Sequence, residues 1–239
     1  MTLDLEFMMR TFLLASAGIP VTLMITVVTL LLSFPAAFFM AISRIHRIKG
    51  LKVISSVYVS LIRGTPMVLQ ILLVYSLLPS LLNSLFKSAG LDIDIFGINP
   101  IVYAYAVFTF NTTASLSEVF RSALQTVDIG QMEAALSTGL SSFQSYRRII
   151  IPQALVSAIP NICNVTINLI KGTSLAFIMT VKDITAIAKV EAAYGYNYIE
   201  AYIVVFLLYI IVCSAVQQLF KLIENSFNVN SHIPAKEVG

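Results

Sequence analysis

The chain has 239 residues, of which 58% are hydrophobic and only 11% are charged. Soluble domains carry about 25% charged residues, so this chain has too few charges to cover the surface of a soluble fold. The composition excludes a cytosolic enzyme, a nucleic-acid-binding module and a disordered linker. The net charge of +3 is small, so the positions of the charges are more informative than their sum.

Five segments are long and apolar enough to cross a bilayer as helices, which takes about 20 residues each. They cover approximately residues 12–42, 53–85, 100–120, 154–181 and 201–222. The first is longer than a bilayer needs, so we expect it to tilt or to begin at the interface. It also follows Asp4 and Glu6, which is not typical of a cleaved signal peptide. The sequence therefore predicts an all-α membrane protein with five transmembrane helices.

Basic residues in the loops predict the orientation, because cytoplasmic loops carry an excess of Lys and Arg. An odd number of spans puts the two termini on opposite sides. One side collects nine basic residues, which are Arg44, Arg47, Lys49, Lys52, Arg121, Arg147, Arg148, Lys221 and Lys236. The other side collects four, which are Arg10, Lys87, Lys182 and Lys189. We therefore expect the N-terminus outside and the C-terminus in the cytoplasm. Residues 1–239 then form a single transmembrane domain, with a cytoplasmic loop at 122–152 and a cytoplasmic tail at 223–239.

The cytoplasmic loop between the third and fourth spans has a pattern of its own. Residues 133–138 favour a helix, which Gly139 can end in the left-handed conformation. Ser141 or Ser142 can then cap a second short helix, and Pro152 breaks that helix and opens the next span. The pattern predicts a helix–turn–helix on the cytoplasmic face, with a simple interfacial re-entry loop as the alternative.

The same loop resembles the signature of permease subunits of ABC importers, which reads Glu-Ala-Ala, three residues, Gly, nine residues, Ile, one residue and Leu-Pro. The matching positions are Glu133, Ala134, Ala135, Gly139, Ile149 and Pro152. The chain has Ile151 where Leu is usual, which is a nearly isosteric replacement. In that family the loop forms a coupling helix that docks on the ATP-binding subunit. The resemblance therefore implies the type I ABC importer fold and a coupling role for these residues together with Arg147 and Arg148.

Further segments resemble one branch of this family, the polar amino-acid permeases. They are Gly18–Leu23, Arg63–Pro66 with Gln70, Ser117–Arg121 with Gly130–Gln131, and Lys171–Leu175. The likeness covers most of residues 13–223 and implies a multi-pass subunit of a bacterial plasma membrane. It also implies three partners: an ABC ATPase dimer, a second permease subunit in a homodimer or heterodimer, and an extracytoplasmic solute-binding protein. Membrane lipid surrounds such a subunit, and no nucleic acid is expected.

Arg63 has an expected place of its own in the second span. Residues 65–82 are long enough to cross the membrane by themselves, so we expect Arg63 near the cytoplasmic interface. Residues 51–62 would then form an amphipathic lead-in, and Pro66 would lie in the first turn of the spanning helix.

Small polar residues inside the predicted spans are candidates for a substrate pathway. Asn161, Asn164 and Asn168 recur at three and four residues, so they share one helical face, and Lys171 extends this stripe. A charge at mid-membrane costs about 2.5–3.5 kcal/mol, so Lys171 needs a substrate α-carboxylate, a partner such as Glu118, or an outer interface where it snorkels. The stripe can equally be a helix–helix contact. The full candidate set is Thr65, Gln70, Asn111, Ser115, Asn161, Asn164, Asn168, Lys171, Thr173 and Ser174.

Two departures from the branch pattern concern the substrate. The branch has Tyr before its Glu-bearing turn and Asp after its Lys, whereas this chain has Ser115 and Gly172 at those positions. Both changes remove bulk, and the second removes a negative charge. We therefore expect a cavity that suits arginine or lysine less than a larger neutral amino acid, with cystine one candidate.

The chain has no G-x-x-x-x-G-K-[ST] phosphate loop, so we expect a non-enzymatic permease whose partner ATPase binds ATP and Mg²⁺. The alternative is an ion-coupled secondary amino-acid transporter, but the sequence offers no carboxylate pair at mid-membrane, since Glu118 lies near the cytoplasmic end of its span. A membrane-embedded enzyme is a third reading, for which no nucleophile or metal constellation is visible. Cys163 and Cys213 lie in apolar stretches and are interpreted as buried thiols.

Overall fold

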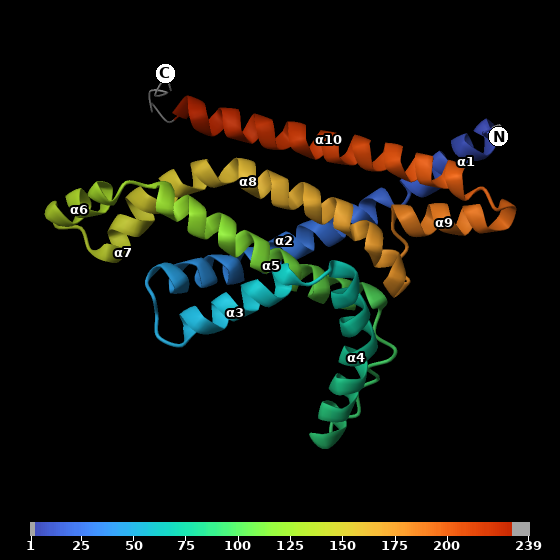
Figure 1. The fold of residues 1–239 in the computed structure, drawn as a ribbon, viewed down its shortest axis with the longest axis horizontal. Helices are drawn as coiled ribbons and strands as arrows, with labels where there is room; N and C mark the ends of the chain where they lie inside the picture. Colours follow the sequence, from blue (N-terminus) through green and yellow to red (C-terminus); the bar gives the residue numbers. More distant parts are fainter. Residues whose placement is uncertain (1–2, 231–239) are drawn as a thin grey trace.

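The computed structural model describes residues 3–230, and its elements are helices throughout that part of the chain. Four long helices, α2, α5, α8 and α10, run alongside one another in the body of the molecule (Figure 1). α5 (Pro100–Thr126) is the central one, because α2, α3, α4 and α8 all pack against it. The predicted all-α fold class is confirmed.

The first predicted span consists of two helices, α1 (Leu5–Ser16) and α2 (Ile19–Ile45). It begins earlier than predicted because the carboxylate of Asp4 caps α1 and so starts the helix outside the apolar run. The two helices meet at Gly18, which packs against the backbone at the start of α9. A Cβ atom on Gly18 would lie 2.8 Å from the Cα atom of Ile184. The close approach of two backbones therefore explains why this position is glycine.

The second predicted span is divided at Pro66 into α3 (Leu51–Gly64) and α4 (Met67–Ser88). α3 packs against α2 and α5, as the amphipathic lead-in predicted. α4 turns away and crosses the direction of α5 (Figure 1). Pro66 has extended backbone and precedes α4, so it lies one position before the first turn predicted for it.

Small hydroxyl and methyl side chains fill the contact between α2 and α5. The buried residues on this side of α2 are Thr22, Thr26, Thr29, Ser33, Ala37 and Ala41. Ser33 also donates a hydrogen bond across the contact to the carbonyl of Thr109, at 3.2 Å. Small side chains let two helix backbones approach closely, and interhelical hydrogen bonds add to the packing. α5 is therefore covered on several sides by other helices.

The loop after α5 contains the predicted helix–turn–helix. α6 (Ile129–Ser137) is followed by Gly139 in the left-handed conformation, with φ of +85°, and then by α7 (Ser142–Ser145). Ser141 and Gln144 form a capping box: the Gln144 N–H donates to the Ser141 hydroxyl at 3.3 Å, and the Gln144 side chain accepts from the Ser141 N–H at 2.9 Å. The expected cap and turn are confirmed.

Pro152 lies at the start of α8, as predicted, but it does not break the helix that precedes it. A π-helical turn, η1 (Tyr146–Ile150), continues directly into α8 (Ile151–Gly172). Pro152 occupies the first turn of α8, where a missing N–H is tolerated, and the wider π turn before it changes the usual hydrogen-bond register. The knob (residues 129–150) and α8 are therefore joined by continuous helical backbone.

The last part of the chain holds a 3₁₀ turn, η2 (Thr173–Met179), a short helix α9 (Ile184–Gly195) and the long α10 (Tyr198–Asn230). The sequence did not predict α9, although Asp183 caps it by accepting a hydrogen bond from the Ala186 N–H at 2.8 Å. α1, α9 and α10 pack together around alanines and Leu208. Of the predicted tail, residues 223–230 belong to α10, whereas 231–239, with Lys236, lie outside the described residues.

Four helical stretches within residues 3–230 are long and apolar enough to cross a membrane. They are Leu5–Ile45, Met67–Ser88, Ser142–Met179 and Tyr198–Phe227. α5, with 27 residues, is long enough but is not among them. Its middle carries Asn111, Thr112, Thr113 and Ser115, and these polar side chains are tolerated because neighbouring helices, rather than lipid, cover much of its surface.

Candidate functional site

A small polar cleft lies between the start of α4, the middle of α5 and α8. Its volume is about 80 Å³, and its lining residues are Met67, Asn111, Thr112, Ser115, Val165, Asn168 and Leu169. Three predicted pathway residues, Asn111, Ser115 and Asn168, therefore meet although they lie far apart in the sequence. Pockets for small molecules usually measure about 300–1,000 Å³, so this cleft is only part of what a ligand would need.

Gln70 connects α3 and α4 to this cleft. Its side-chain nitrogen donates to the Ile62 carbonyl at 2.8 Å and to the Thr65 hydroxyl at 2.9 Å, and its oxygen accepts from Asn111 at 3.1 Å. Thr65 and Gln70 thus join the predicted set around Asn111. Arg63 follows Ile62, so it lies beside the middle of α5, and its predicted place near the cytoplasmic interface stays a prediction. It is exposed, and no carboxylate of residues 3–230 forms a salt bridge with it.

The predicted stripe on α8 is confirmed as one exposed helical face. Its members are Asn161, Asn164, Asn168 and Lys171. Lys171 does not pair with Glu118, because both carboxylate oxygens of Glu118 are bound by arginines. The stripe is an unusual surface for a helix that is otherwise apolar enough to span a membrane.

Two members of the predicted pathway point elsewhere. Thr173 is buried and donates its hydroxyl hydrogen bond to the Ile170 carbonyl at 2.7 Å. Ser174 bonds in the same way to the carbonyl of Lys171, at 2.7 Å. Both hydroxyls therefore satisfy backbone groups of the turn that ends α8, and neither residue lines the cleft.

Gly172 lies beside the cleft and leaves room there. A Cβ atom at this position would be 3.4 Å from the sulfur of Met67 and 3.8 Å from the ring of Phe108. Both are ordinary contacts, so the backbone here accepts a side chain. Because Met67 also lines the cleft, a side chain at position 172 would lie close to its rim.

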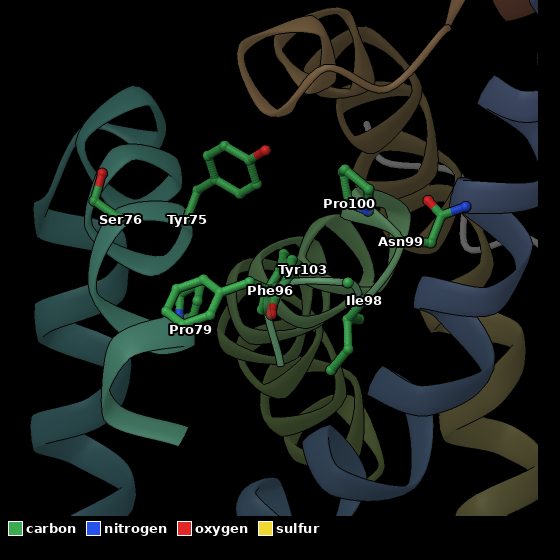
Figure 2. Close-up of a pocket in the computed structure, with 9 residues that line it drawn as sticks. Tyr75, Ser76, Pro79, Phe96, Ile98, Asn99, Pro100 and Tyr103 are labelled. Carbon is green, nitrogen blue, oxygen red and sulfur yellow. The ribbon is translucent and has the colours of Figure 1, made fainter. Parts of the chain in front are cut away.

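A larger cavity, of about 480 Å³, lies further along α4 and α5 (Figure 2). Its lining residues are Tyr75, Ser76, Pro79, Phe96, Gly97, Ile98, Asn99, Pro100 and Tyr103. None was predicted, because the residues before α5 form a loop without a recognisable motif, although the aromatic residues on α4 and α5 were a signal. Between this cavity and the polar cleft, both helices carry buried side chains, Ile71 on α4 and Val107 and Phe108 on α5.

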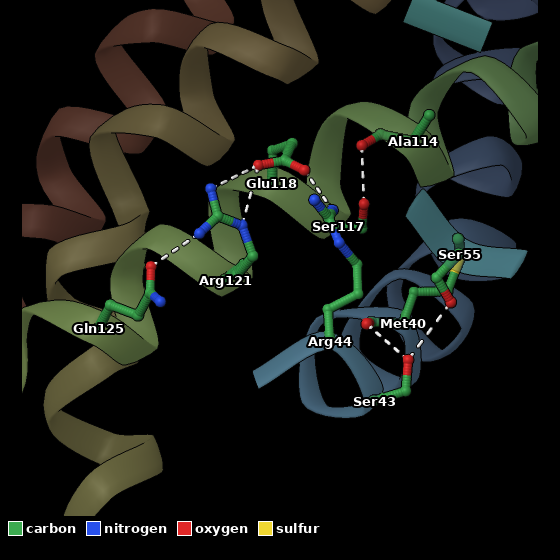
Figure 3. A network of polar contacts seen from close by, with 9 residues as sticks. All are labelled: Met40, Ser43, Arg44, Ser55, Ala114, Ser117, Glu118, Arg121 and Gln125. Atoms are coloured by element: carbon green, nitrogen blue, oxygen red, sulfur yellow. Dashed lines mark hydrogen bonds and ion pairs between the residues drawn. The ribbon is translucent and has the colours of Figure 1, made fainter. Parts of the chain in front are cut away.

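A charged network joins the ends of α2 and α5 (Figure 3). Arg44 on α2 donates to one carboxylate oxygen of Glu118 on α5. Arg121 donates to the other oxygen through two nitrogens, at 3.0 and 2.8 Å, and also to the side chain of Gln125 at 2.8 Å. The side chains of Arg44 and Glu118 are less than one-fifth exposed. One carboxylate thus neutralises only one of two arginine charges, of which Arg44 is largely buried and Arg121 is one-third exposed.

The knob presents both charged and apolar side chains. Among its predicted coupling residues, Glu133, Ala134, Gly139, Arg147 and Arg148 are exposed, and so is Pro152 at its junction with α8, whereas Ala135 is buried and Ile149 is half-buried. Large apolar side chains lie between the charges: Ile129 is 76% exposed and Phe143 is 73% exposed. Exposed apolar groups with a polar rim are typical of protein–protein contact surfaces.

These features define a class: an α-helical membrane protein with a polar face along one helix and an exposed helix–turn–helix knob at one end. Residues 33–229 match the family described as "Binding-protein-dependent transport system inner membrane component". The match covers most of the chain, so the chain belongs to this family of membrane permeases. The resemblance to ABC-importer permeases that the knob sequence carries is confirmed.

Three known proteins resemble the chain over nearly its whole length. The "Probable amino-acid permease protein YxeN" of Bacillus subtilis (strain 168) is 36% identical over 223 residues, covering 92% of this chain and 95% of that protein. The "L-cystine transport system permease protein TcyL" of the same organism is 34% identical over 215 residues, covering 90% and 87%. A chain of a "Crystal structure of an amino acid ABC transporter with histidines" superposes with a TM-score of 0.78 at 28% identity, covering 95% and 100%.

Proposed function

We propose that this chain is the membrane-spanning subunit of an ATP-driven amino-acid importer and that it forms half of the translocation pathway. The observation that carries the proposal is the exposed polar face of α8. Three asparagines and a lysine facing lipid would be costly, so this face needs a second protein chain and a hydrated path between the two. The relatives named as amino-acid permeases support the amino-acid class of the substrate.

The proposal includes five spans, which the lengths of the helices support. In this proposal α1 and α2 form the first span, α3 and α4 the second, and α5, α8 and α10 the third, fourth and fifth. The distribution of Lys and Arg supports an outer N-terminus and a cytoplasmic knob and C-terminus. α5 counts as a span because its neighbours, rather than lipid, cover its polar middle.

The second permease subunit closes the pathway, as a homodimer or heterodimer. A solute-binding protein would deliver the amino acid on the outer side, and an ABC ATPase dimer would bind ATP and Mg²⁺ on the inner side. In this scheme closure of the ATPase dimer moves the two knobs, and the helices rock about the central site. The continuous helix from the knob into α8 supports this coupling, because it connects the docking surface to the polar stripe.

The residues around the cleft support a substrate without a cationic side chain. The residues that line the cleft are neutral, so no carboxylate lies among them, and two cations outside the lining are exposed: Lys171, on the same stripe of α8 as Asn168, and Arg63, next to Ile62, whose carbonyl binds Gln70. A substrate α-carboxylate would therefore meet a cation, whereas arginine or lysine would find no counter-charge. Cystine, which has two α-carboxylates, is the candidate we favour, and the relative named as an L-cystine permease supports it.

An ion-coupled secondary transporter is the alternative function. It would require an ionisable carboxylate that is free to bind a proton or Na⁺ in the pathway. Glu118 does not offer one, because Arg44 and Arg121 occupy both of its oxygens. The exposed apolar side chains of the knob, Ile129 and Phe143, would also stay in contact with water in such a transporter, whereas an ATPase subunit would cover them.

The test is reconstitution with the ATPase subunit and measurement of ATP hydrolysis and amino-acid uptake together. Replacing Glu133 with Ala, or Gly139 with Val, should leave ATPase activity but lower uptake at least tenfold, because the knob no longer transmits the movement. Lys221→Gln, an exposed charge on α10, is the matched control and should behave as the parent chain. Normal uptake by the knob variants, or uptake driven by an ion gradient without ATP, would contradict the proposal.

A further inference from the structure

The turn between α2 and α3 carries several basic residues, and hydrogen bonds hold its backbone in place. Three cations, Arg47, Lys49 and Lys52, are exposed within six residues. The turn is held by hydrogen bonds from the Ile48 N–H to the Ser43 carbonyl and from the Lys52 N–H to the Ile48 carbonyl, each at 3.0 Å. The buried hydroxyls of Ser43 and Ser55 lie 3.3 Å apart and connect the two helices just behind it. We call residues 46–52 the basic turn.

Arg47 holds an unfavourable backbone conformation within the basic turn. Its φ is +51°, in the left-handed region that is unfavourable for an L-residue with a side chain. Strained residues of this kind persist where the surrounding structure fixes them, and they cluster at binding sites. The side chain of Arg47 is exposed in this conformation.

No carboxylate neutralises these three cations within residues 3–230. The salt bridges there join Arg10 to Glu191, and Arg44 and Arg121 to Glu118. Among the residues in these salt bridges, Arg44 lies nearest to the turn in the sequence, and its partner Glu118 is already bound by two arginines. The basic turn therefore presents three positive charges without an acidic partner, a charge that an anion would complement.

An apolar surface begins directly at the basic turn and continues along α3. Ile48 is exposed within the turn, and Val53, Ile54 and Val57 are exposed on the first two turns of the helix. Cations at the end of a helix whose outer face is apolar match the layering of a phospholipid, with the phosphate at the charges and the acyl chains along the helix. A soluble anion would contact the cations but would leave the apolar face of α3 uncovered.

We infer that the basic turn binds the headgroup of an anionic phospholipid, with its acyl chains against α3. Placing this lipid in the cytoplasmic leaflet rests on the orientation under the proposed function, whereas the binding itself does not. The turn also touches the knob, because the rings of His46 and Tyr146 pack edge to face with their centroids 5.3 Å apart. A bound lipid would hold the turn against η1, so anionic lipid should raise ATP-coupled uptake.

The experiment is native mass spectrometry of the purified full chain with phosphatidylglycerol or phosphatidylcholine of the same acyl chains. We expect phosphatidylglycerol to bind more tightly, and the triple variant Arg47→Gln, Lys49→Gln, Lys52→Gln to weaken it by on the order of 100-fold, at roughly fivefold for each cation. The matched control Lys87→Gln, Lys182→Gln, Lys221→Gln removes the same charge from exposed sites elsewhere. It should bind phosphatidylglycerol as the parent chain does.

Three outcomes would overturn the inference: equal binding of the two lipids, equal weakening in the control variant, or displacement of the lipid by inorganic phosphate at similar concentration, which would indicate a free-phosphate site. Lys49→Glu alone preserves the test if the triple variant does not fold, and it should still lower phosphatidylglycerol binding about 25-fold, because it changes the charge by two units. Because the readout is lipid binding, a failure of ATP-driven transport would leave it intact and distinguishable. Uptake in vesicles with and without phosphatidylglycerol then tests the coupling to the knob.

Discussion

Arg44 at the end of α2 and Glu118 in α5 form an ion pair that joins the two most closely packed helices of the molecule (Figure 3). Arg121 binds the same carboxylate from one turn further along α5. We predict that Glu118→Gln destabilises the chain by about 1–3 kcal/mol, because it leaves the largely buried Arg44 and the partly exposed Arg121 without a counter-charge. Thermal unfolding in detergent, followed with a thiol-reactive dye on the buried Cys163, should show a melting temperature lower by roughly 3–10 °C.

The control for this prediction is Gln125→Ala, which removes only the neutral outer end of the network. It should lower the melting temperature by less than half as much. Equal effects of the two variants would show that the charge on Glu118 has no special structural role.

Gly18 should tolerate no side chain. A Cβ atom there would meet the backbone of Ile184, so Gly18→Ala must separate α1 and α2 from α9, at a cost of about 1–3 kcal/mol. Gly64→Ala is the matched control, because a Cβ atom on Gly64 meets nothing within 4 Å and the φ of Gly64 lies outside the left-handed region. The same dye assay should show a clear loss of stability for the first variant and none, or a slight gain, for the second. Similar melting temperatures would contradict the close approach at Gly18.

Gly172→Asp should change which amino acids the permease accepts. The new carboxylate would lie near Met67 at the rim of the polar cleft, where it could pair with a cationic side chain. In the parent transporter we expect cystine, and not arginine, to compete with radiolabelled cystine uptake. In Gly172→Asp, arginine should inhibit at least tenfold more strongly than in the parent, which corresponds to about 1.4 kcal/mol.

Gly172→Asn provides the control for charge, because it has nearly the same size without the carboxylate. It should leave arginine ineffective. Arginine inhibition in the parent or in the Asn variant would show that the absence of a carboxylate at this position does not set the specificity.

Ser141→Ala should loosen the knob without weakening the membrane helices. Ser141 and Gln144 cap each other's backbone at the start of α7, and loss of an N-cap side chain costs about 1 kcal/mol. We expect the affinity for the ATPase subunit to fall roughly fivefold, while the melting temperature stays the same. Ser142→Ala is the control, because the described structure gives its hydroxyl no protein partner. An unchanged affinity for both would contradict the role of the cap.

Features set by local sequence were predicted well. The knob was predictable because its turn depends on one glycine and its second helix on one capping serine, each within a few residues of the structure it determines. The stripe on α8 was predictable because a 3.6-residue period places Asn161, Asn164 and Asn168 on one face regardless of tertiary contacts. The pairing of Glu118, by contrast, depends on where α2 ends relative to α5, and no local pattern contains that distance.

The other differences also come from tertiary packing. α9 is a short helix between two apolar runs, so its sequence offers no clear signal. It is stabilised by its contacts with α1 and α10. The change of direction at Pro66, from α3 to α4, also depends on how these helices pack against α5, and the predicted place of Arg63 near the cytoplasmic interface stays a prediction. The predicted break at Pro152 is absent because the π turn before it changes the hydrogen-bond register, and the helix tolerates the missing N–H of the proline.

The polar middle of α5 determines how the chain can enter the membrane during synthesis. A nascent helix partitions from the translocon into lipid according to its own apolarity, and α5 gains less from that transfer than α2, α8 or α10. In the proposed five-span arrangement its retention would therefore depend on α2, which is made earlier and offers the hydroxyl side chains against which α5 packs. A chain truncated before α8 would leave the other side of α5 facing lipid, so the central helix is secured only late in biogenesis.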